Sequence, residues 1–464
     1  MKMVGWVLNV AEATSPGTRD RIYGPHRLIM EFDNPFFSNQ LILLSSGTKP
    51  GSTMQQKQYG LYSAPVVVGA LGFFVDIYDL LLFSVVRRSS FKDLNVSESA
   101  MKTIGENIIS WQMLGLTIGG IIWGVLGDKK GRKSVLFGSI LLYSLATIAN
   151  GFVTDIDQYS WLRFIAGLGL AGELGASITL ISELLPKEKR GIATSIIGTS
   201  GVLGSITAYF VFLISGENWR LCYYIGGAMG LALLFLRVRV LESRMYDNVK
   251  QEKVQLGNFW MFFNNRDRFF RFLRGILIGI PVWYIIGVLI SFSDEFAKQF
   301  GITGFDQPKA LMLQYTALAF GDMSAGFISN YLKSRKKAML IYYGIIIVFI
   351  LLFFGLKGGG NAFNMYLICM GLGFGSGISV MYIAMSAEQF GTNLRATAAI
   401  SIPNLVRGCL PLILFLFQFL RGESVFGDYV TAAWVTGVVV LSLGIISVIK
   451  SKESFSNEMD FIEK

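Results

Sequence analysis

The stretch Gly124-Val-Leu-Gly-Asp-Lys-Lys-Gly-Arg-Lys133 lies between two long apolar runs, residues 108–127 and 134–152. A charged cluster this short, between two segments of membrane length, predicts a tight turn in water. Its four basic residues indicate that this side of the membrane is cytoplasmic, because basic residues gather in cytoplasmic loops. The single acid, Asp128, is not required by orientation and needs a separate explanation.

The composition is that of a membrane protein with several spans. Of the 464 residues, 52% are hydrophobic and 16% are charged, whereas soluble proteins carry about 25% charged residues. The net charge of +10 lies in short loops, which membrane orientation explains without a nucleic-acid partner. His26 is the only histidine and the three cysteines fall inside apolar runs. We therefore expect no metal site, no cofactor and no enzymatic activity.

Twelve apolar segments are predicted to span the membrane, six on each side of one long polar loop. Basic residues gather after the even-numbered segments, so both termini are expected in the cytoplasm. The loop 87–102 is an exception, because it contains Arg87, Arg88, Lys92 and Lys102. The predicted spans are 61–86, 106–127, 134–153, 157–185, 190–215, 219–240, 269–292, 308–332, 337–356, 361–387, 393–420 and 426–449.

The fold class that follows is an all-α membrane protein with twelve transmembrane helices in two pseudo-symmetric six-helix bundles. The bundles cover residues 54–240 and 269–450, joined by a central loop, 241–268, and followed by a cytoplasmic tail, 451–464. Residues 1–53 lack a spanning run and form an N-terminal extension, either disordered or created by a start site assigned too early. We favour the second explanation, because Met54 begins a short polar segment directly before the first span.

Two sets of charged and small residues recur in the second half of the chain. Gly124 matches Gly326 and Asp128 matches Asn330, both with an offset of 202 (326 − 124, 330 − 128). The pattern Glu-x6-Arg recurs with an offset of 205 (388 − 183, 395 − 190), as Glu183…Arg190 and Glu388…Arg395. These echoes indicate a duplicated six-span unit, which is the architecture of many secondary transporters.

Five charged residues are expected near the middle of the membrane: Asp76, Asp79, Glu173, Asp322 and Arg407. Each costs about 3 kcal/mol at the bilayer centre on insertion scales, so they are expected to face a shared interior. A structural ion-pair network is one explanation. We favour proton coupling by the four acids, because one central arginine cannot neutralise four carboxylates.

Arg407 is the candidate contact for an anionic or zwitterionic substrate, because a guanidinium binds carboxylate or phosphate in two places. Its alternative role is counter-ion to one of the acids. Asn404 lies one turn before it on the same face. Other candidate substrate contacts have structural alternatives: Trp283 and Tyr284 could simply pack, and Arg163 could snorkel to the interface. Pro281 is expected to kink its helix.

These motifs together resemble the major facilitator superfamily over about residues 60–450. Residues 124–133 resemble its loop 2–3 motif, Arg163-Phe-Ile-Ala-Gly167 its fourth-span element, and the Glu-x6-Arg pairs its cytoplasmic charges. The resemblance implies a cytoplasmic gate. Its residues would be Gly124, Asp128, Gly131, Arg132, Lys133, Glu183, Arg190, Glu388 and Arg395.

The subfamily is indicated by two further stretches. Residues 72–80 resemble the first span of phosphate:proton symporters, but Gly287 stands where those proteins have an aspartate after the span-7 tryptophan. Residues 388–397 resemble metabolite:proton symporters, which take up organic acids, amino acids or betaines. Residues 195–212 contain no proline, unlike the span-5 Gly-Pro element of drug exporters.

We therefore expect a proton-coupled symporter of a small organic anion, amino acid or betaine-like zwitterion that works by alternating access. A phosphate:proton symporter is the alternative, and a transporter-like membrane sensor is the alternative of another class. We expect a monomer in the bacterial cytoplasmic membrane, with a small solute, protons and lipid as partners. Asp128 would hold the two halves together on the cytoplasmic side, and Asn330 would make the second copy weaker.

Overall fold

The structure is a computed structural model that describes residues 27–29, 43–45, 63–130, 132–184, 187–242 and 259–455. The chain divides into two units, Met1–Gln58 and Tyr59–Lys464. In the first unit, β1 (Arg27–Ile29) and β2 (Leu43–Ser45) pair antiparallel, with Leu28 opposite Leu44. Most of the predicted N-terminal extension lies outside the described residues.

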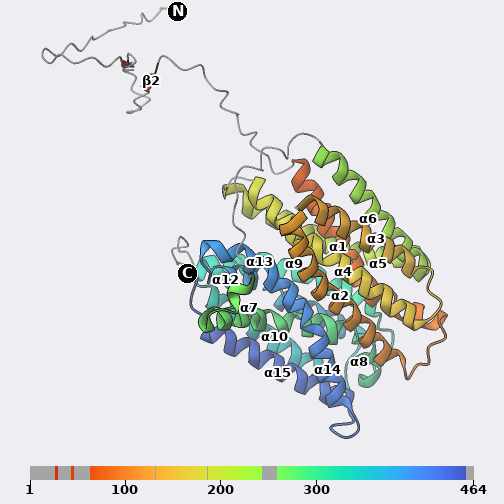
Figure 1. Cartoon of the computed structure of the whole chain (residues 1–464). Coiled ribbons are helices and arrows are strands. Elements are labelled where there is room, and N and C mark those ends of the chain that lie inside the picture. Colours follow the sequence, from red (N-terminus) through yellow and green to blue (C-terminus); the bar gives the residue numbers. More distant parts are fainter. Residues whose placement is uncertain are drawn as a thin grey trace, which may run out of the picture. The chain divides into compact units, whose positions relative to one another are not determined.

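The described elements of the second unit are all helices and follow the predicted spans closely (Figure 1). By length and composition, six of the described helical segments can each cross a membrane. The first half contains α1 (Ala64–Asp93), α2 (Met101–Lys130), α3 (Arg132–Asn150), α4 (Ile156–Leu184), α5 (Lys187–Ile214) and α6 (Trp219–Glu242). The second half contains η2 (Phe259–Phe262), α7 (Arg266–Tyr284), η3 (Ile285–Ile290), α8 (Ser293–Phe300), α9 (Gln307–Leu332), α10 (Arg335–Gly355), α11 (Ala362–Gly375), α12 (Ser379–Ala387), α13 (Thr392–Gly408), α14 (Leu410–Arg421) and α15 (Tyr429–Lys450).

Three predicted spans are interrupted. Span 7 changes from α7 into a π-helical turn, η3, directly after Tyr284 and four residues after Pro281. Span 10 breaks between α11 and α12, and span 11 breaks at Cys409. The tight turn predicted between the spans 106–127 and 134–153 is shorter than expected, because α2 continues to Lys130 and α3 begins at Arg132. Lysine is a good helix former, and a helix end in water needs no apolar sequence.

Helices α2 and α4 cross so closely that glycine is required at the contact. A Cβ added to Gly119 would lie 2.3 Å from the carbonyl oxygen of Leu168, and one added to Gly167 would lie 2.0 Å from that of Gln112. Real side chains essentially never come so close. The two backbones are therefore in direct contact, as in other membrane helix pairs that use small residues.

The second half repeats this crossing between α9 and α11. A Cβ on Gly321 would lie 2.2 Å from the carbonyl oxygen of Phe374, and one on Gly373 would lie 2.1 Å from that of Gln314. Gly321 follows Gly119 by 202 residues (321 − 119), the same offset that the sequence motifs show. The duplication inferred from charged residues therefore also holds for the packing of the helices.

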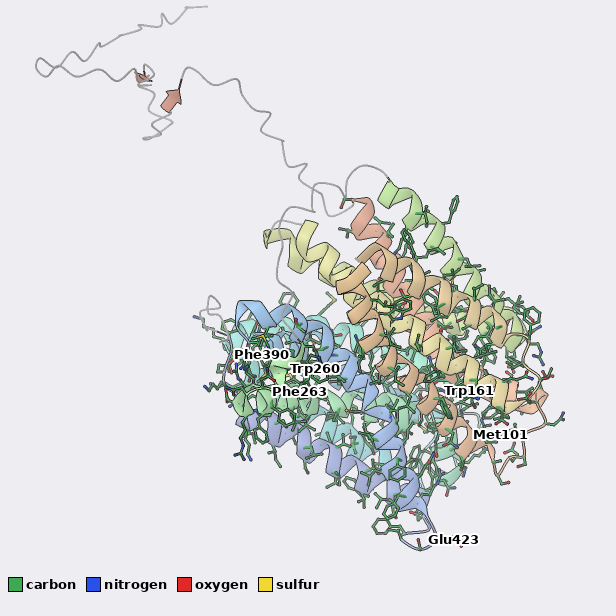
Figure 2. The ribbon with its side chains drawn as sticks, in the orientation of Figure 1. Met101, Trp161, Trp260, Phe263, Phe390 and Glu423 are labelled. Carbon is green, nitrogen blue, oxygen red and sulfur yellow. The ribbon has the colours of Figure 1, made fainter. Side chains whose placement is uncertain are left out.

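The two halves meet along α2–α13, α2–α14 and α5–α9. At the α2–α13 crossing, a Cβ on Gly408 would lie 2.1 Å from the Thr117 hydroxyl oxygen. Figure 2 shows Trp260, Phe263 and Phe390 at one end of the helices and Met101, Trp161 and Glu423 toward the other. We call these the Phe390 end and the Met101 end.

Candidate functional site

Arg407 of α13 lies beside one aromatic side chain from another helix, and two tyrosine hydroxyls are within its electrostatic range. Its guanidinium carbon is 5.6 Å from the ring centre of Trp283 on α7. It also lies close enough to Tyr315 of α9 and Tyr382 of α12 to interact with their hydroxyls electrostatically. The three rings are buried and Arg407 is half-buried. Among the described residues, no carboxylate forms an ion pair with Arg407, so its guanidinium can serve an anionic ligand. We call these four residues the Arg407 cluster.

Other predicted site residues lie near this cluster. Asp322 of α9 is half-buried and acts electrostatically on the same Tyr382 hydroxyl. Asn404 is buried at the α2–α13 contact. A Cβ added to Gly120 of α2 would lie 3.8 Å from the Cβ of Asn404. Tyr284 points elsewhere, because its fully buried hydroxyl donates to the Ala433 carbonyl at 2.6 Å. That bond favours the packing explanation for Tyr284, while a substrate role for Asn404 stays a prediction.

Asp79 and Arg163 form a second buried polar site, in the first half. An Arg163 guanidinium nitrogen lies 3.4 Å from an Asp79 carboxylate oxygen, and another donates to the Asp79 carbonyl at 2.9 Å. The Thr147 hydroxyl donates to the same carboxylate oxygen at 2.8 Å. Arg163 is fully buried, so it does not snorkel to the interface. A role for Arg163 in substrate binding stays a prediction.

Two tyrosines continue this polar site toward the Met101 end. Arg163 lies over the ring of Tyr223 at 5.6 Å, and the hydroxyls of Tyr223 and Tyr159 are 2.7 Å apart. Both tyrosines are fully buried. The position of Arg163 is thus fixed by Asp79 on one side and by an aromatic ring on the other.

The remaining predicted acids and most of the predicted gate are not placed by side-chain contacts. Asp76 is buried on α1, three residues before Asp79. The side chain of Glu173 lies outside the described residues, although its helix α4 is described. Most residues of the predicted gate are likewise not described at the level of side chains: Gly124, Asp128, Gly131, Arg132, Lys133, Glu183, Arg190 and Arg395. The gate at the Phe390 end therefore stays a prediction.

Glu388 is the one predicted gate residue whose contacts are described. It pairs with Arg335 at 3.3 Å and accepts a hydrogen bond from the Ser454 hydroxyl at 2.6 Å. The neighbouring Glu453 accepts bonds from the backbone nitrogens of Arg335 and Lys336, at 2.8 and 3.3 Å, at the start of α10. Burial alone would raise the pKa of the Glu453 carboxyl, but hydrogen bonds outweigh it and hold that pKa below its usual value. The tail is thus fastened to a helix N-terminus.

A dense set of ion pairs joins the two halves at the Met101 end. Arg87 of α1 lies 2.5 Å from Asp294 of α8, and Arg88 pairs with the same carboxylate. Glu295 is 3.5 Å from both Arg88 and Lys102. Arg87, Asp294 and Glu295 are at most 5% exposed, so these pairs are largely shielded from water.

Two further cross-half pairs complete this set. Arg421 of α14 holds both carboxylate oxygens of the buried Glu106 of α2, at 2.6 and 3.0 Å. At the surface, Lys298 pairs with Glu98 at 2.9 Å. We call the whole set the inter-half cluster; it consists of Arg87, Arg88, Glu98, Lys102, Glu106, Asp294, Glu295, Lys298 and Arg421.

The inter-half cluster explains the exception to the charge rule at residues 87–102. Three of the four basic residues there, Arg87, Arg88 and Lys102, are paired with Asp294 and Glu295 rather than facing a membrane surface alone. Burial would raise the pKa of the Asp294 carboxyl, but Arg87 and Arg88 outweigh it and hold that pKa below its usual value. Asp294 is therefore ionised at neutral pH, and acidification to below the usual carboxylate range would be needed to discharge it.

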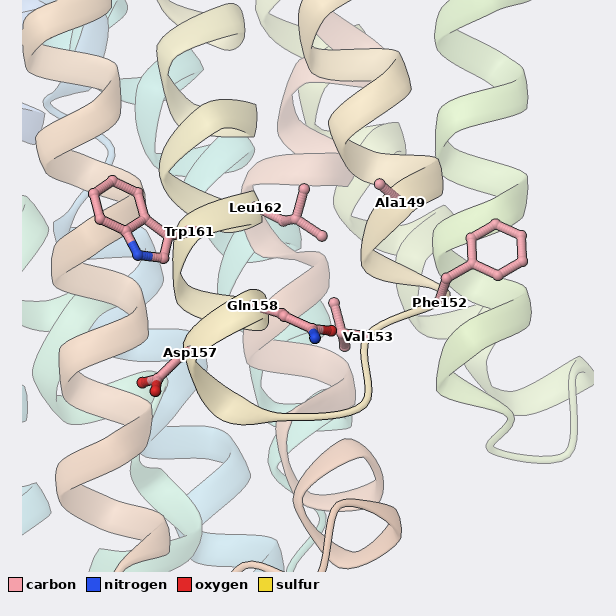
Figure 3. A pocket seen from close by; sticks show the side chains of 7 residues that line it. All are labelled: Ala149, Phe152, Val153, Asp157, Gln158, Trp161 and Leu162. Atoms are coloured by element: carbon pink, nitrogen blue, oxygen red, sulfur yellow. The ribbon is translucent and has the colours of Figure 1, made fainter.

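A pocket of about 530 Å³ lies at the Met101 end of α3 and α4 (Figure 3). Its lining is mostly apolar and includes Phe152, Trp161 and Leu162. None of its lining residues belongs to the Arg407 cluster or to the Asp79–Arg163 pair. Phe152 and Trp161 are more than half exposed, as aromatic residues at a membrane interface often are. We do not assign this pocket to the solute.

Comparison with known proteins identifies the family. The family model described as Major Facilitator Superfamily matches residues 69–413. The chain belongs to the major facilitator superfamily. The predicted superfamily membership and twelve-helix fold are thereby confirmed. The fold also matches that of a D-xylose–proton symporter, with a TM-score of 0.64 at 16% identity over 85% of this chain and 98% of that chain.

The sequence relatives of this superfamily member are transporters. It is 26% identical to a Bacillus subtilis protein provisionally named as a niacin/nicotinamide transporter, NiaP, over 72% of this chain and 82% of the relative. It is 22% identical to the benzoate transport protein of Acinetobacter baylyi, over 72% of this chain and 78% of the relative. The chain is thus a multi-pass membrane transporter of small metabolites and not an enzyme.

Sequence reasoning missed Tyr315, Tyr382 and most of the inter-half cluster. The two tyrosines could not be found, because helix rotation was unknown. The cluster did leave a signal: the first loop of one half begins with Arg87-Arg88, and the corresponding segment of the other half contains Asp294-Glu295. Opposite charges in equivalent loops of a duplicated unit predict a contact between the halves.

Proposed function

We propose that this transporter is a proton-coupled symporter of small organic anions, with aromatic carboxylates as its main substrate class. The observation that carries the proposal is the Arg407 cluster. It combines a guanidinium that has no carboxylate partner among the described residues with the ring of Trp283, and the hydroxyls of Tyr315 and Tyr382 lie within its electrostatic range. A guanidinium binds a carboxylate through two parallel hydrogen bonds, and aromatic walls accept a planar ring.

The relatives support the same substrate class. Niacin and benzoate, for which two relatives are named, are both a carboxylate on a six-membered aromatic ring. Such an anion presents one charged edge to Arg407 and two flat faces to the aromatic side chains. Phosphate offers no apolar face and would leave the rings of the cluster without a partner.

Proton coupling is assigned to the Asp79–Arg163 pair, with Asp76, Glu173 and Asp322 as further candidates. Asp79 is fully buried, and its charge is balanced by Arg163 at 3.4 Å. A proton on Asp79 would release Arg163 from this attraction and change the contact between α1 and α4. A carboxylate that loses its ion pair with an arginine when it binds a proton can couple proton entry to helix movement.

We further propose that the transporter lies in the bacterial cytoplasmic membrane as a monomer, with both termini in the cytoplasm. The basic loops after even-numbered spans support this orientation. The Met101 end then faces outward, and the inter-half cluster seals the outer side. The structure would accordingly represent an outer-closed state of an alternating-access cycle.

Uptake by proteoliposomes tests the function directly. With an imposed inward proton gradient, labelled benzoate and nicotinate are expected to accumulate, and accumulation should stop when the gradient is collapsed. Phosphate and betaine are run beside them, and accumulation of either alone would replace the carboxylate assignment. Ligand binding without uptake or counterflow would instead indicate a membrane sensor.

The inter-half cluster gives a sharp test of the proposed outer gate. Asp294→Asn leaves Arg87 buried without its partner, and breaking a buried ion pair from one side costs about 3–5 kcal/mol. We expect the outer-closed population to fall by more than about a hundredfold relative to the open one. The distance between two spin labels is measured by double electron–electron resonance. The labels are attached at Ser99→Cys and Glu423→Cys, which are exposed and lie in different halves, and the native cysteines are removed.

The matched control for this gate is Glu98→Gln. It removes one carboxylate of the same cluster, but Glu98 is 69% exposed and its pair with Lys298 lies in water, where such pairs contribute little. Its distance distribution should resemble that of the parent protein. Equal distributions for Asp294→Asn and Glu98→Gln would show that the buried pairs do not hold the outer side closed.

A further inference from the structure

Gln112 and Gln314 occupy equivalent positions in the two halves, 202 residues apart (314 − 112). The backbone carbonyl of each faces a glycine of the neighbouring helix, Gly167 or Gly373. Their side chains differ. The Gln112 amide donates to the Leu80 carbonyl of α1 at 3.4 Å. Gln314 is also fully buried, yet neither its amide nitrogen nor its amide oxygen has a hydrogen-bond partner within the described part of the chain.

The difference originates in the helix that each glutamine faces. Tyr78 of α1 and Tyr284 of α7 make the same hydroxyl-to-carbonyl bond, and their offset of 206 (284 − 78) makes Ile286 the equivalent of Leu80. Ile286 lies in the π-helical turn η3, against which α9 packs.

The Ile286 carbonyl already has two donors. Its oxygen accepts from the backbone nitrogen of Ser291 at 3.0 Å and from the Ser291 hydroxyl at 2.8 Å. A carbonyl oxygen has two lone pairs, so both are used. The π turn has therefore taken the acceptor that Gln314 would use by analogy with Gln112.

A buried amide without partners destabilises the state in which it occurs. Single π turns inside α-helices are rare and are frequent at functional sites. Rewinding η3 to a regular α-helix would shift the register by one residue, and thus rotate the segment after it by about 100° around the helix axis. That segment contains Asp294 and Glu295, the acids that hold Arg87 and Arg88.

We propose that Gln314 is a positioning residue for the opening of the outer side. In the outer-open state η3 rewinds, Ser291 leaves the Ile286 carbonyl, and the Gln314 amide donates to it as Gln112 does to Leu80. The rotation withdraws Asp294 from Arg87 at the same time. This inference rests on the alternating access of the proposed function, but on neither the identity of the solute nor proton coupling.

The test uses the Ser99/Glu423 spin-label pair, in the parent protein and in Asp294→Asn, without added solute. Gln314→Leu removes a bond of the open state and an unpaired amide of the closed state. The open population should therefore fall roughly tenfold. Gln112→Leu is the matched control. Gln112 of α2 bonds to α1 within the first half, and α1 has no π turn to rewind, so the bond is expected in both states and the ratio of populations should not change.

Ser291→Ala gives a second test with the opposite sign. It removes the hydroxyl that occupies the Ile286 carbonyl, so the open population should rise. Because the Ser291 hydroxyl also lies 3.2 Å from that of Ser84, Ser84→Ala is measured to separate this cross-half contact, and its effect should be the smaller one. If Gln314→Leu does not fold, Ser291→Ala and Ser84→Ala carry the test.

Three results would overturn the inference: no fall for Gln314→Leu, an equal fall for Gln112→Leu, or no rise for Ser291→Ala beyond that of Ser84→Ala. Failure of the proposed function is distinguishable. If uptake proves independent of the proton gradient while the populations shift as stated, Gln314 keeps its role and the symport assignment is lost.

Discussion

Replacing Asp79 by asparagine is expected to abolish proton-driven accumulation of the solute while preserving its exchange across the membrane. The asparagine amide can still accept hydrogen bonds from Arg163 and Thr147, which hold the aspartate in the parent protein. It cannot take up or release a proton. The helices can therefore still complete the solute-loaded half of the cycle, but the proton gradient no longer drives it.

The expected effect is large. With one proton per solute, a gradient of about two pH units supports roughly hundredfold accumulation, since each tenfold ratio corresponds to about 1.4 kcal/mol. In proteoliposomes Asp79→Asn should reduce this ratio to about one, while counterflow of preloaded solute continues. Thr147→Val is the matched control: it removes a hydrogen bond from the same carboxylate oxygen but leaves the proton acceptor, so accumulation should persist.

The neighbouring acid extends this test. Asp76→Asn changes a second buried carboxylate on the same helix, and comparing the two variants shows which one couples to protons. If both accumulate solute as the parent protein does, the proton assignment on α1 is wrong and coupling has to be sought at Glu173 or Asp322.

Replacing Arg407 by glutamine is expected to raise the KM for benzoate uptake by about ten- to a hundredfold. The change removes a charge-assisted pair with the substrate carboxylate, and hydrogen bonds to charged groups contribute about 1.5–3 kcal/mol. It also removes the guanidinium that lies 5.6 Å from the Trp283 ring centre. Arg407→Lys should recover only part of the loss, because an ammonium does not reproduce the planar two-point contact.

The role of Arg407 as the anion contact can be tested by removing the charge from the ligand as well as from the protein. Benzamide has the shape of benzoate but no charge, so its competition with benzoate uptake should be equally weak in the parent protein and in Arg407→Gln. Arg266→Gln, at an exposed arginine before the seventh span, makes the same charge change away from the cluster. If Arg266→Gln and Arg407→Gln impair uptake equally, the loss reflects overall charge, and Arg407 is not the anion contact.

The sequence predicted the fold well because membrane length and loop charge leave few alternatives. The span around Arg163 agrees with α4 within one residue at each end, whereas the helix around Asp76 continues to Asp93, seven residues beyond the predicted end. The interruptions at η3 and Cys409 were not predicted. A π turn or a break depends on which carbonyls find donors in neighbouring helices, as Ile286 finds Ser291, and apolar composition is the same with or without it.

The candidate site was only partly readable from the sequence. Arg407 and Trp283 were proposed as substrate contacts, and the structure brings them together, although their function stays a prediction. Tyr284, next in the chain, turns to Ala433 instead. The partner of Asp79 was missed because Arg163 is 84 residues away, and distance in the sequence says nothing about which faces of two helices meet.

The close contact between Gly408 and Thr117 has a mechanical consequence. It lies in the interior of α2, about 24 Å from one end of that helix and about 20 Å from the other at 1.5 Å per residue. In the alternating-access cycle proposed above, the crossing would act as a fulcrum. A rigid-body rotation of about 15° around it displaces the ends of α2 by about 5–6 Å and moves the contact itself very little. A movement of that size would carry Lys102 and Glu106 beyond ion-pair reach of the opposite half, so a small angle at the glycine would be enough to open the proposed outer gate.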